Sequence, residues 1–245
     1  MSPLTGFLRV EMLLRDVLYV SYLVHASRVR PMVPDILPLA TLEGDNVFVS
    51  VVVLESTGVR LSYLPFPRFS YRQVNVRTYV TDPQTGNRAV YFLRSGVTSR
   101  FISRITGAIG VPWQHIECTV DVTADSHRYI SSYEVSGYWD GEFSIEAEES
   151  ILQPVQIPPF DKTEAAVDYL VRPLIGFMGQ NGRVGRFSIW HPEVKPRAGE
   201  VGYFKFPLLD SMNLFDGKKS REQQSVLLVS RARFYIYMPP AKVKL

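Results

Sequence analysis

The segment Gln73–Thr81 reads QVNVRTYVT, and residues 88–94 read RAVYFLR after the turn-like DPQTGN of residues 82–87. β-Branched and aromatic residues dominate both runs, which favours strands. Two such runs separated by proline, glycine and asparagine predict a β-hairpin. This hairpin is the clearest structural unit of the sequence, and it indicates a chain built mainly from antiparallel strands.

Other segments repeat this β-rich pattern. The predicted strands are Val47–Glu55, His115–Thr123, Arg128–Tyr138, Glu142–Ser150, Val184–Trp190, Val201–Pro207 and Ser225–Met238. Short helices are expected at Ala26–Val33, Thr98–Ile109 and Lys162–Leu170. The fold class is therefore mainly β (α+β), with a few short helices.

The helix expected at Thr98–Ile109 has the strongest helical periodicity. Thr98 or Ser99 is expected to cap it and Gly110 to end it, and Asp161 is a similar cap for the third helix. The apolar residues that share one face of the helix are Phe101, Ile102, Ile105, Ala108 and Ile109. A face of this kind is typical of packing against a core.

Residues 1–245 are expected to form a single domain. Gln153–Phe160 holds three prolines and no charge, which makes it the best candidate for a linker. Strands are predicted at similar density on both sides of it, however, which favours one continuous sheet system over two domains.

Composition excludes several classes of protein. Lys plus Arg number 27 and Asp plus Glu 24, so the net charge of +3 is too weak to indicate nucleic-acid binding. The single cysteine, Cys118, excludes an internal disulfide and a multi-cysteine metal site. The four histidines lack metal-ligand spacing, so neither a metal nor a cofactor is expected.

The sequence has no sign of export or of membrane insertion. Charged residues interrupt the apolar N-terminal run, and no stretch approaches 18 uncharged apolar residues. The cytoplasm is therefore the expected compartment, and no membrane partner is expected. There is also no phosphate-binding P-loop and no G-x-S-x-G motif, and the glycine-rich residues 179–185 read as a hairpin turn.

The strand around Arg77 has one polar and one apolar face. Alternation places Asn75, Arg77 and Tyr79 together, opposite Val74, Val76, Thr78 and Val80. In one interpretation the polar face meets water, as in many antiparallel sheets. In the other it lines the inside of a curved sheet and binds an anionic or carbonyl ligand, because the planar guanidinium donates two hydrogen bonds to a carboxylate.

Polar and aromatic residues next to the Thr98 helix form a second group of candidates. Arg94 precedes the helix, and Trp113, Gln114 and His115 lie in the segment that leads to the next strand. His191 ends another predicted strand. Each also has a purely structural interpretation: a surface or ion-paired arginine, a core tryptophan, and hydrogen-bonded histidines.

Seven motifs occur in order along the chain: Met32–Leu39, Leu54–Gly58, Val74–Val80, Ala89–Leu93, Gly110–Trp113, Asp168–Arg172 and Gly185–Pro192. Together they resemble the acetoacetate decarboxylase-like superfamily, and especially its bacterial YqjF-like branch, the domain of unknown function 2071. The resemblance implies a large, strongly curved antiparallel sheet, a cone or incomplete barrel, around a small-molecule pocket. It also implies that a homo-oligomer is possible.

The sequence departs from this family at the catalytic lysine. The decarboxylases form a Schiff base between a β-keto acid and a lysine that follows a proline just after a helix. Here Trp113 and Gln114 follow Pro112, and no lysine occurs between Met1 and Asp161. Lys205, within a later predicted strand, would make a site of different architecture. A retained imine mechanism is therefore not expected.

The resulting hypothesis is a small-molecule-binding protein whose pocket suits a small carboxylate or keto acid. The expected ligand-binding residues are Asn75, Arg77, Tyr79, Arg94, Trp113, Gln114 and His191. The alternative is a non-covalent acid–base enzyme, a hydratase, tautomerase or lyase acting on a keto acid. In that case Glu55 or His115 is the base and Arg77 stabilises an enolate. A structural protein with a vestigial pocket is a third reading, so whether the protein is an enzyme stays open.

Overall fold

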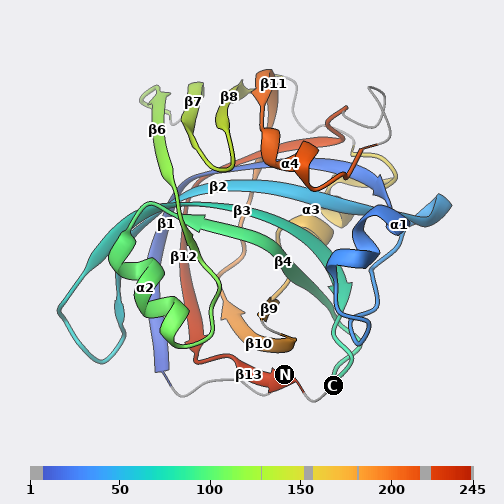
Figure 1. Cartoon of the computed structure of the whole chain (residues 1–245). Helices are drawn as coiled ribbons and strands as arrows, with labels where there is room; N and C mark the ends of the chain where they lie inside the picture. The colour runs from blue at the N-terminus through green and yellow to red at the C-terminus, as the bar shows by residue number, and fades with distance from the viewer. Residues whose placement is uncertain (1–7, 128, 152–156, 181, 216–221, 244–245) are drawn as a thin grey trace.

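The computed structural model describes residues 8–127, 129–151, 157–180, 182–215 and 222–243 (Figure 1). Its strands are β1 (Leu8–His25), β2 (Asn46–Leu61), β3 (Phe69–Thr81), β4 (Arg88–Val97), β5 (Gln114–His115), β6 (Glu117–Ala124), β7 (Ile130–Tyr138), β8 (Glu142–Glu149), β9 (Ile175–Gln180), β10 (Arg183–Trp190), β11 (Arg197–Lys205), β12 (Ser225–Met238) and β13 (Ala241–Val243). Its α-helices are α1 (Ala26–Val29), α2 (Arg100–Ala108), α3 (Thr163–Leu170) and α4 (Pro207–Ser211).

Strands from both halves of the chain close into an uneven ring. Their order is β10-β9-β4-β3-β2-β1-β12, and β12 returns to β10 through the pairs Ile189–Ile236 and Trp190–Tyr235. The pairs within the sheet are antiparallel, except that β4 runs parallel to β5 and to β9. The prediction of a mainly β, strongly curved sheet is confirmed, and Figure 1 shows β1 to β4 arching over β9 and β10.

The strand β1 lies between β2 and β12 in the ring, although the sequence analysis assigned no strand there. Val17 and Tyr19 point to one core cluster, and Leu18 and Val20 to the other. A strand buried on both faces reads as a continuous apolar run without alternation. A bulge near Asp16, whose φ is 47°, further interrupts its periodicity.

A branch of four strands, β11-β8-β7-β6, continues the sheet from β12. Its apolar side chains, among them Tyr133, Val135 and Ile145, pack with Leu18 and Val51 of the ring. We call this side of β1 to β4 the outer face. The opposite, inner face packs with α3 and with residues of β12 on the far side of the ring.

The predicted hairpin is confirmed as β3 and β4, and its turn is tied to β10. The Asp82 carboxylate accepts hydrogen bonds from the Thr85 hydroxyl at 2.7 Å and from the backbone N–H of Gln84 at 3.1 Å. It also forms an ion pair with Arg186 of β10 at 2.9 Å. Both side chains are almost wholly buried, with 0% and 1% exposure, so this pair joins two parts of the ring inside the protein.

The helix α2 forms where predicted, with the Ser99 hydroxyl accepting from the Ile102 amide at 3.3 Å. The expected core-facing side is wrong, however. Only Ile102 and Thr106 are buried, whereas Phe101, Ile105 and Ile109 are 54%, 45% and 46% exposed. Helical periodicity identifies an apolar face but not what covers it, and here the helix turns a different side to the ring.

Two smaller expectations also change. The predicted strand His115–Thr123 is split into β5 and β6, which pair with different strands. Lys162, without a side-chain cap bond, precedes α3 in place of Asp161. Residues 153–156 of the candidate linker lie outside the described residues, while strands from both sides of it share one sheet. None of the described helices has the length and apolarity needed to cross a membrane.

Candidate ligand-binding site

The polar face of β3 lies inside the ring. Asn75 and Tyr79 are 4% and 0% exposed, and Arg77 is half-buried. The interpretation in which this face meets water is therefore wrong, because the sheet curves around it and α3 covers it. Both faces of β3 are therefore largely buried: one carries valine side chains and the other carries polar groups.

Arg77 has polar and aromatic neighbours but no acidic partner. Its Nη2 atom donates to the Leu170 carbonyl at 2.6 Å and lies 3.4 Å from the Tyr79 hydroxyl. Its guanidinium lies 5.2 Å from the ring centre of Tyr19, and its buried Nε atom has no hydrogen-bond partner among the described residues. No carboxylate among the described residues forms an ion pair with it.

The charge of Arg77 persists in spite of burial. Burial opposes the charged form, but the hydroxyls of Tyr79 and Tyr19 keep the pKa of Arg77 above its ordinary value. The other buried arginine, Arg186, has Asp82 as its counter-ion. Burying a charge without a counter-ion is costly. Of these two arginines, only Arg77 has no carboxylate among the described residues to compensate its charge.

Hydroxyl groups hold the neighbourhood of Arg77 in place. Tyr79 donates to the Leu170 carbonyl at 2.9 Å and lies 3.0 Å from the Ser50 hydroxyl, which lies 2.7 Å from that of Ser21. Because the Tyr79 proton goes to the carbonyl, Ser50 donates to Tyr79. This chain of bonds fixes the ring of Tyr79 beside the guanidinium, and it involves four separate elements.

An amide and a hydroxyl extend the polar region along the inner face. The Asn75 Oδ1 atom accepts a hydrogen bond from the side-chain Nε2 of Gln73 at 2.9 Å. Ser95 of β4 lies directly opposite Asn75, and its hydroxyl is buried without a partner. Asn75 and Ser95 therefore offer hydrogen-bonding capacity to a small polar molecule.

His191 presents an unpaired basic nitrogen inside the protein. Its ring stacks on Phe234 with centroids 4.5 Å apart, and its Nδ1 atom lies 2.8 Å from the Pro192 carbonyl. A carbonyl only accepts, so Nδ1 carries the proton. The buried Nε2 therefore holds a lone pair, and no group in the described part of the chain hydrogen-bonds to it. Burial lowers the pKa of His191, as do the charges of Arg77 and Arg172, so the ring is neutral near pH 7.

A pocket of about 230 Å³ opens at the edge of β4. β4 pairs with β9 up to Phe92 and with β5 from Gly96 onwards, and the pocket lies between these two contacts. Its lining includes Phe92 and Ser95, the direct cross-strand neighbours of Arg77 and Asn75. The pocket is therefore one strand position away from the polar inner face.

The structure brings Arg94, Trp113 and Gln114 together in the lining of this pocket. Arg94 donates to Gln114 Oε1 at 3.1 Å and pairs with Asp140 at 2.7 Å, and the Trp139 indole donates to the same Gln114 atom at 2.9 Å. The Gln114 carbonyl oxygen is thus engaged beside the β7–β8 turn rather than beside Arg77. The expected ligand-binding residues of β3 therefore lie inside the ring, whereas Arg94, Trp113 and Gln114 form a separate group at the pocket.

The two residues expected to act as a base lie elsewhere. Glu55 is half-buried on the outer face of β2, where its charge helps to raise the pKa of Tyr133. His115 is exposed on β5. No local pattern in the sequence marks Tyr19, Ser95 or the Leu170 carbonyl, because only folding brings these atoms next to Arg77 and Asn75.

The described lysines are all on the surface. Lys162, Lys195, Lys205 and Lys242 are exposed, and Lys205 lies 3.8 Å from Glu142 in the outer branch. The inward orientation considered for Lys205 is therefore wrong. No described lysine lies on the inner face.

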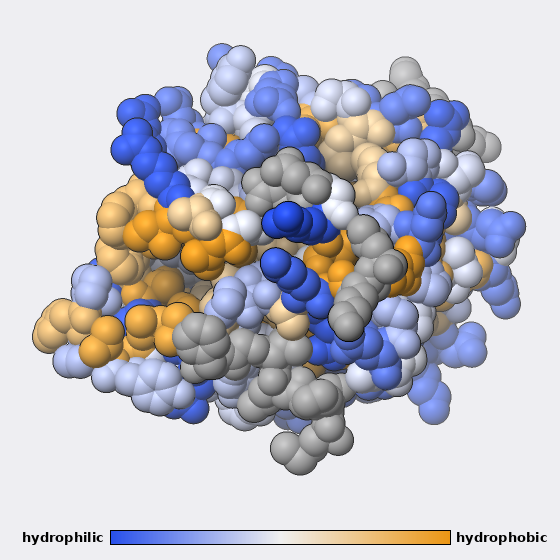
Figure 2. All heavy atoms as spheres, turned by 60° about the horizontal axis from the view of Figure 1, so that its bottom comes forward, coloured by the Kyte–Doolittle hydropathy of each residue, from blue (hydrophilic) through white to orange (hydrophobic). Residues whose placement is uncertain are grey.

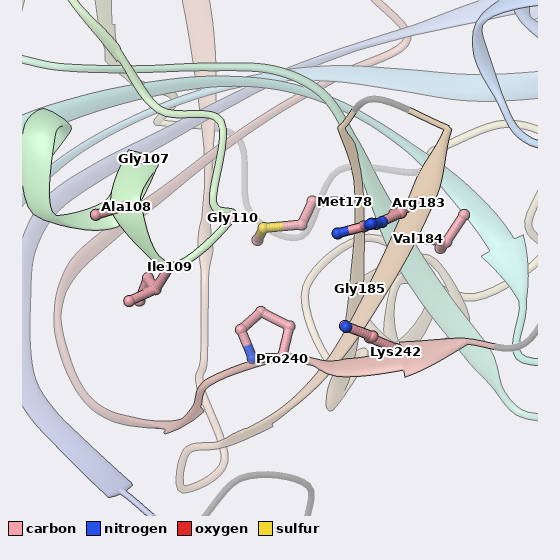
Figure 3. Close-up of a pocket in the computed structure, with 10 residues that line it drawn as sticks. All are labelled: Gly107, Ala108, Ile109, Gly110, Met178, Arg183, Val184, Gly185, Pro240 and Lys242. Atoms are coloured by element: carbon pink, nitrogen blue, oxygen red, sulfur yellow. The ribbon is translucent and has the colours of Figure 1, made fainter.

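A second pocket, of about 440 Å³, lies between the end of α2 and strands β9, β10 and β13 (Figure 3). Arg183 and Lys242 contribute its charged groups, and Met178 lines both this pocket and the smaller one. The described lining holds no carboxylate. This second pocket therefore presents positive charge only among its described lining residues, which favours anions, whereas the smaller pocket has Asp140 next to Arg94.

Solved structures with this fold include an acetoacetate decarboxylase and an enzyme complexed with pyruvate. The biosynthetic enzyme MppR in complex with pyruvate has a TM-score of 0.65 at 11% identity, with 98% of this chain and 92% of that chain covered. An acetoacetate decarboxylase from Legionella pneumophila has a TM-score of 0.63 at 12% identity, covering 99% and 88%. An acetoacetate decarboxylase-like enzyme from Sphingomonas wittichii has a TM-score of 0.61 at 8% identity, covering 96% and 93%.

At these identities the likeness establishes the fold alone, and it confirms the acetoacetate decarboxylase-like architecture. No curated protein compared with the chain matches it. The model of the family DUF2071, described as an uncharacterized conserved protein, matches residues 11–232. The chain therefore belongs to the DUF2071 family.

Proposed function

We propose that this protein binds a small carboxylate or keto acid inside the ring, with Arg77 as the counter-ion. The observation that carries the proposal is a half-buried guanidinium, with its Nε atom fully buried, that has no carboxylate partner among the described residues. A bound carboxylate supplies the missing charge, and the unpaired Nε atom of Arg77 supplies a donor for it. Asn75 and the Ser95 hydroxyl are placed to bind the remaining polar atoms.

The pocket at the β4 edge is the proposed entrance. Phe92 and Ser95 line it and neighbour Arg77 and Asn75 across the strand pair. Its volume of about 230 Å³ suits a molecule of a few heavy atoms. Arg94, Trp113 and Gln114 then line the entrance, and Arg183 and Lys242 of the neighbouring pocket attract the anion.

The proposed site works without an imine. The described lysines are exposed, and the position after Pro112 is a tryptophan. The similar enzyme that holds pyruvate supports a keto acid as the ligand class by analogy of fold. We propose binding of the same chemical class through a guanidinium and not through an amine.

Carboxylate binding is tested with a panel of pyruvate, acetoacetate and their neutral amides. The two acids are expected to raise the melting temperature in proportion to their concentration, because they bind only the folded state. The amides are expected to have no effect, since they lack the charge that Arg77 requires. Borohydride added to the acid-bound samples is expected to leave the protein mass unchanged.

Two results would contradict the proposal. Equal stabilisation by acids and amides would mean that the guanidinium is not the recognition element. A mass increase after borohydride would mean that a lysine amine forms the imine after all.

A second candidate function is a non-covalent acid–base reaction on the keto acid, favoured by the unpaired Nε2 of His191. A neutral, buried imidazole close enough to Arg77 for their charges to interact is a suitable base. We place the base there rather than at Glu55 or His115, which lie on the outer face and on the surface. Nε2 takes a proton from the carbon next to the keto group, the C–H electron pair forms the enolate, and Arg77 stabilises the enolate oxygen.

Deuterium exchange into the methyl group of pyruvate tests this reaction. Wild-type protein in D₂O is expected to catalyse exchange that increases as the pH rises through the lowered pKa of His191 and then levels off, since only the neutral ring accepts a proton. The His191→Gln variant is expected to lose the exchange while retaining pyruvate binding. Exchange that survives in this variant would exclude His191 as the base, and absent exchange in the wild type would leave binding as the function.

A further inference from the structure

The charges of this chain are divided unevenly along the sequence. Residues 56–116 contain eight arginines, no lysine and one acidic residue, a net charge of +7. Residues 117–149 contain nine acidic residues and one arginine, a net charge of −8. The overall charge of +3 conceals this division, and a division of this kind indicates partner surfaces of opposite sign.

The first segment forms a basic, apolar surface over α2 and the β2–β3 loop, which we call the basic patch. Its exposed residues are Tyr63, Leu64, Phe66, Arg68, Arg100, Phe101, Arg104 and Ile105. The ring of Phe69, the first residue of β3 after this loop, lies 5.4 Å from that of Phe101, so the end of the loop adjoins the helix. Figure 2 shows hydrophobic side chains gathered at the left of the molecule, where Figure 1 has α2 and this loop.

The basic patch is well exposed and unneutralised. Phe66 and Phe101 are 72% and 54% exposed. None of Arg68, Arg100 and Arg104 forms an ion pair with a described residue. Large contiguous apolar patches on a surface mark interaction sites, and this one carries several positive charges.

The second segment forms the exposed face of β6, β7 and β8, which we call the acidic sheet. Asp121, Glu134 and Glu146 are exposed and lie directly opposite one another on three adjacent strands. Like charges in this arrangement destabilise a sheet. Within the part of the chain that the structure describes, no cation forms an ion pair with these three carboxylates. A cationic surface bound to this face would therefore reduce the repulsion between them.

Aromatic residues accompany the carboxylates on the acidic sheet. Tyr203 of β11 lies directly opposite Glu146 and is 47% exposed, and Tyr138 of β7 is 59% exposed. Aromatic side chains are favoured at protein interfaces. The two surfaces are therefore complementary in charge, and each also has apolar area to bury.

We propose that copies of this chain associate head to tail, the basic patch of one copy lying on the acidic sheet of the next. A patch-to-patch dimer would oppose positive charges, so charge disfavours a twofold contact at either surface. An anionic membrane would account for the basic patch but not for the row of carboxylates. A second copy accounts for both, through guanidinium–carboxylate pairs around Phe66 and Phe101.

This contact joins two different surfaces of the same chain. Such a contact produces a closed ring if the rotation between copies closes, and an open chain if it does not. In a closed ring every basic patch and every acidic sheet is covered. In an open chain one basic patch stays free at one end and one acidic sheet at the other. The proposal is independent of what the ring binds, because neither surface includes Arg77 or His191.

Charge-reversed variants test the contact by light scattering after gel filtration at low salt. One variant carries Arg100→Glu and Arg104→Glu, and the other Glu134→Lys and Glu146→Lys. The wild type is expected to have a mass that is a multiple of 27.9 kDa, and each variant is expected to be a monomer. An equimolar mixture of the two is expected to associate again, since each reversed surface complements the other.

Matched controls separate the contact from changes in net charge or in folding. Arg233→Glu and Glu43→Lys reverse exposed charges outside both surfaces and are expected to retain the wild-type mass. Phe66→Ser, in an exposed loop, is expected to give a folded monomer. A monomeric wild type, variants that keep the wild-type mass, or a mixture that stays monomeric would each overturn the proposal. So would a monomeric wild type that binds phosphatidylserine vesicles through Arg100 and Arg104.

Discussion

Replacing Arg77 with methionine is expected to raise the Kd of a bound keto acid by at least about 30-fold. Removing one partner of a buried, hydrogen-bonded charge pair costs about 2–5 kcal/mol, and about 1.4 kcal/mol corresponds to a tenfold change in Kd. The loss is large because the carboxylate would remain buried without a counter-ion. Titration calorimetry with pyruvate on the wild type and the variant measures it.

The fold is expected to survive this substitution. Tyr79 still donates to the Leu170 carbonyl at 2.9 Å, so that acceptor keeps a partner after the guanidinium is removed. Arg77→Lys retains the charge without the planar fork and is expected to bind with intermediate affinity. Arg233→Met, at an exposed position of β12, is the matched control. Equal affinities of Arg77→Met and Arg233→Met for pyruvate would show that the ligand lies elsewhere.

The Asp82→Asn variant is expected to lose about 3–5 kcal/mol of the free energy of unfolding, the usual cost of leaving one charge of a buried ion pair uncompensated. Arg186 is 1% exposed and would keep its charge without a counter-ion. Burial raises the pKa of Asp82, but bonds from Arg186, Thr85 and the Gln84 amide leave it below its ordinary value. The pair is therefore intact at pH 7, and its contribution is lost only as the pH falls through this lowered pKa. Urea denaturation at pH 7 measures the difference.

Asp35→Asn provides the control for this prediction. Asp35 lies 3.9 Å from Arg30 and is fully exposed, and exposed pairs contribute at most about 1 kcal/mol. Adding Arg186→Met to Asp82→Asn removes both buried charges and is expected to restore part of the lost stability. Equal losses in Asp82→Asn and Asp35→Asn would mean that the buried pair does not stabilise the ring.

Local patterns predicted the elements whose two faces differ or whose ends are marked. The β3–β4 hairpin follows from β-rich runs around a turn, and α2 follows from its Ser99 cap and its helical periodicity. β1 was missed because both of its faces are buried, which removes the alternation that identifies a strand. The apolar face of α2 was identified but not its burial: Ile102 is buried, whereas Phe101 and Ile105 remain about half exposed.

The candidate site was predictable only as a set of side chains on one face. Alternation placed Asn75, Arg77 and Tyr79 together, but it left open whether that face meets water or the interior. Tyr19 and the Leu170 carbonyl are distant from Arg77 in sequence and carry no motif. Gln114, expected beside Arg77, is instead held by Arg94 and Trp139.

Local sequence patterns establish which residues share a face and where the hairpin turns, and residue identity establishes that a tryptophan and a glutamine follow Pro112. These are local properties, set by the strand period, by turn residues and by residue identity. Only the folded chain shows that the polar face of β3 is enclosed, and that among the described residues Arg186 has a counter-ion whereas Arg77 has none. The reason is that burial and charge pairing depend on contacts between residues far apart in the chain, and these exist only once the sheet has curved and closed through β10 and β12.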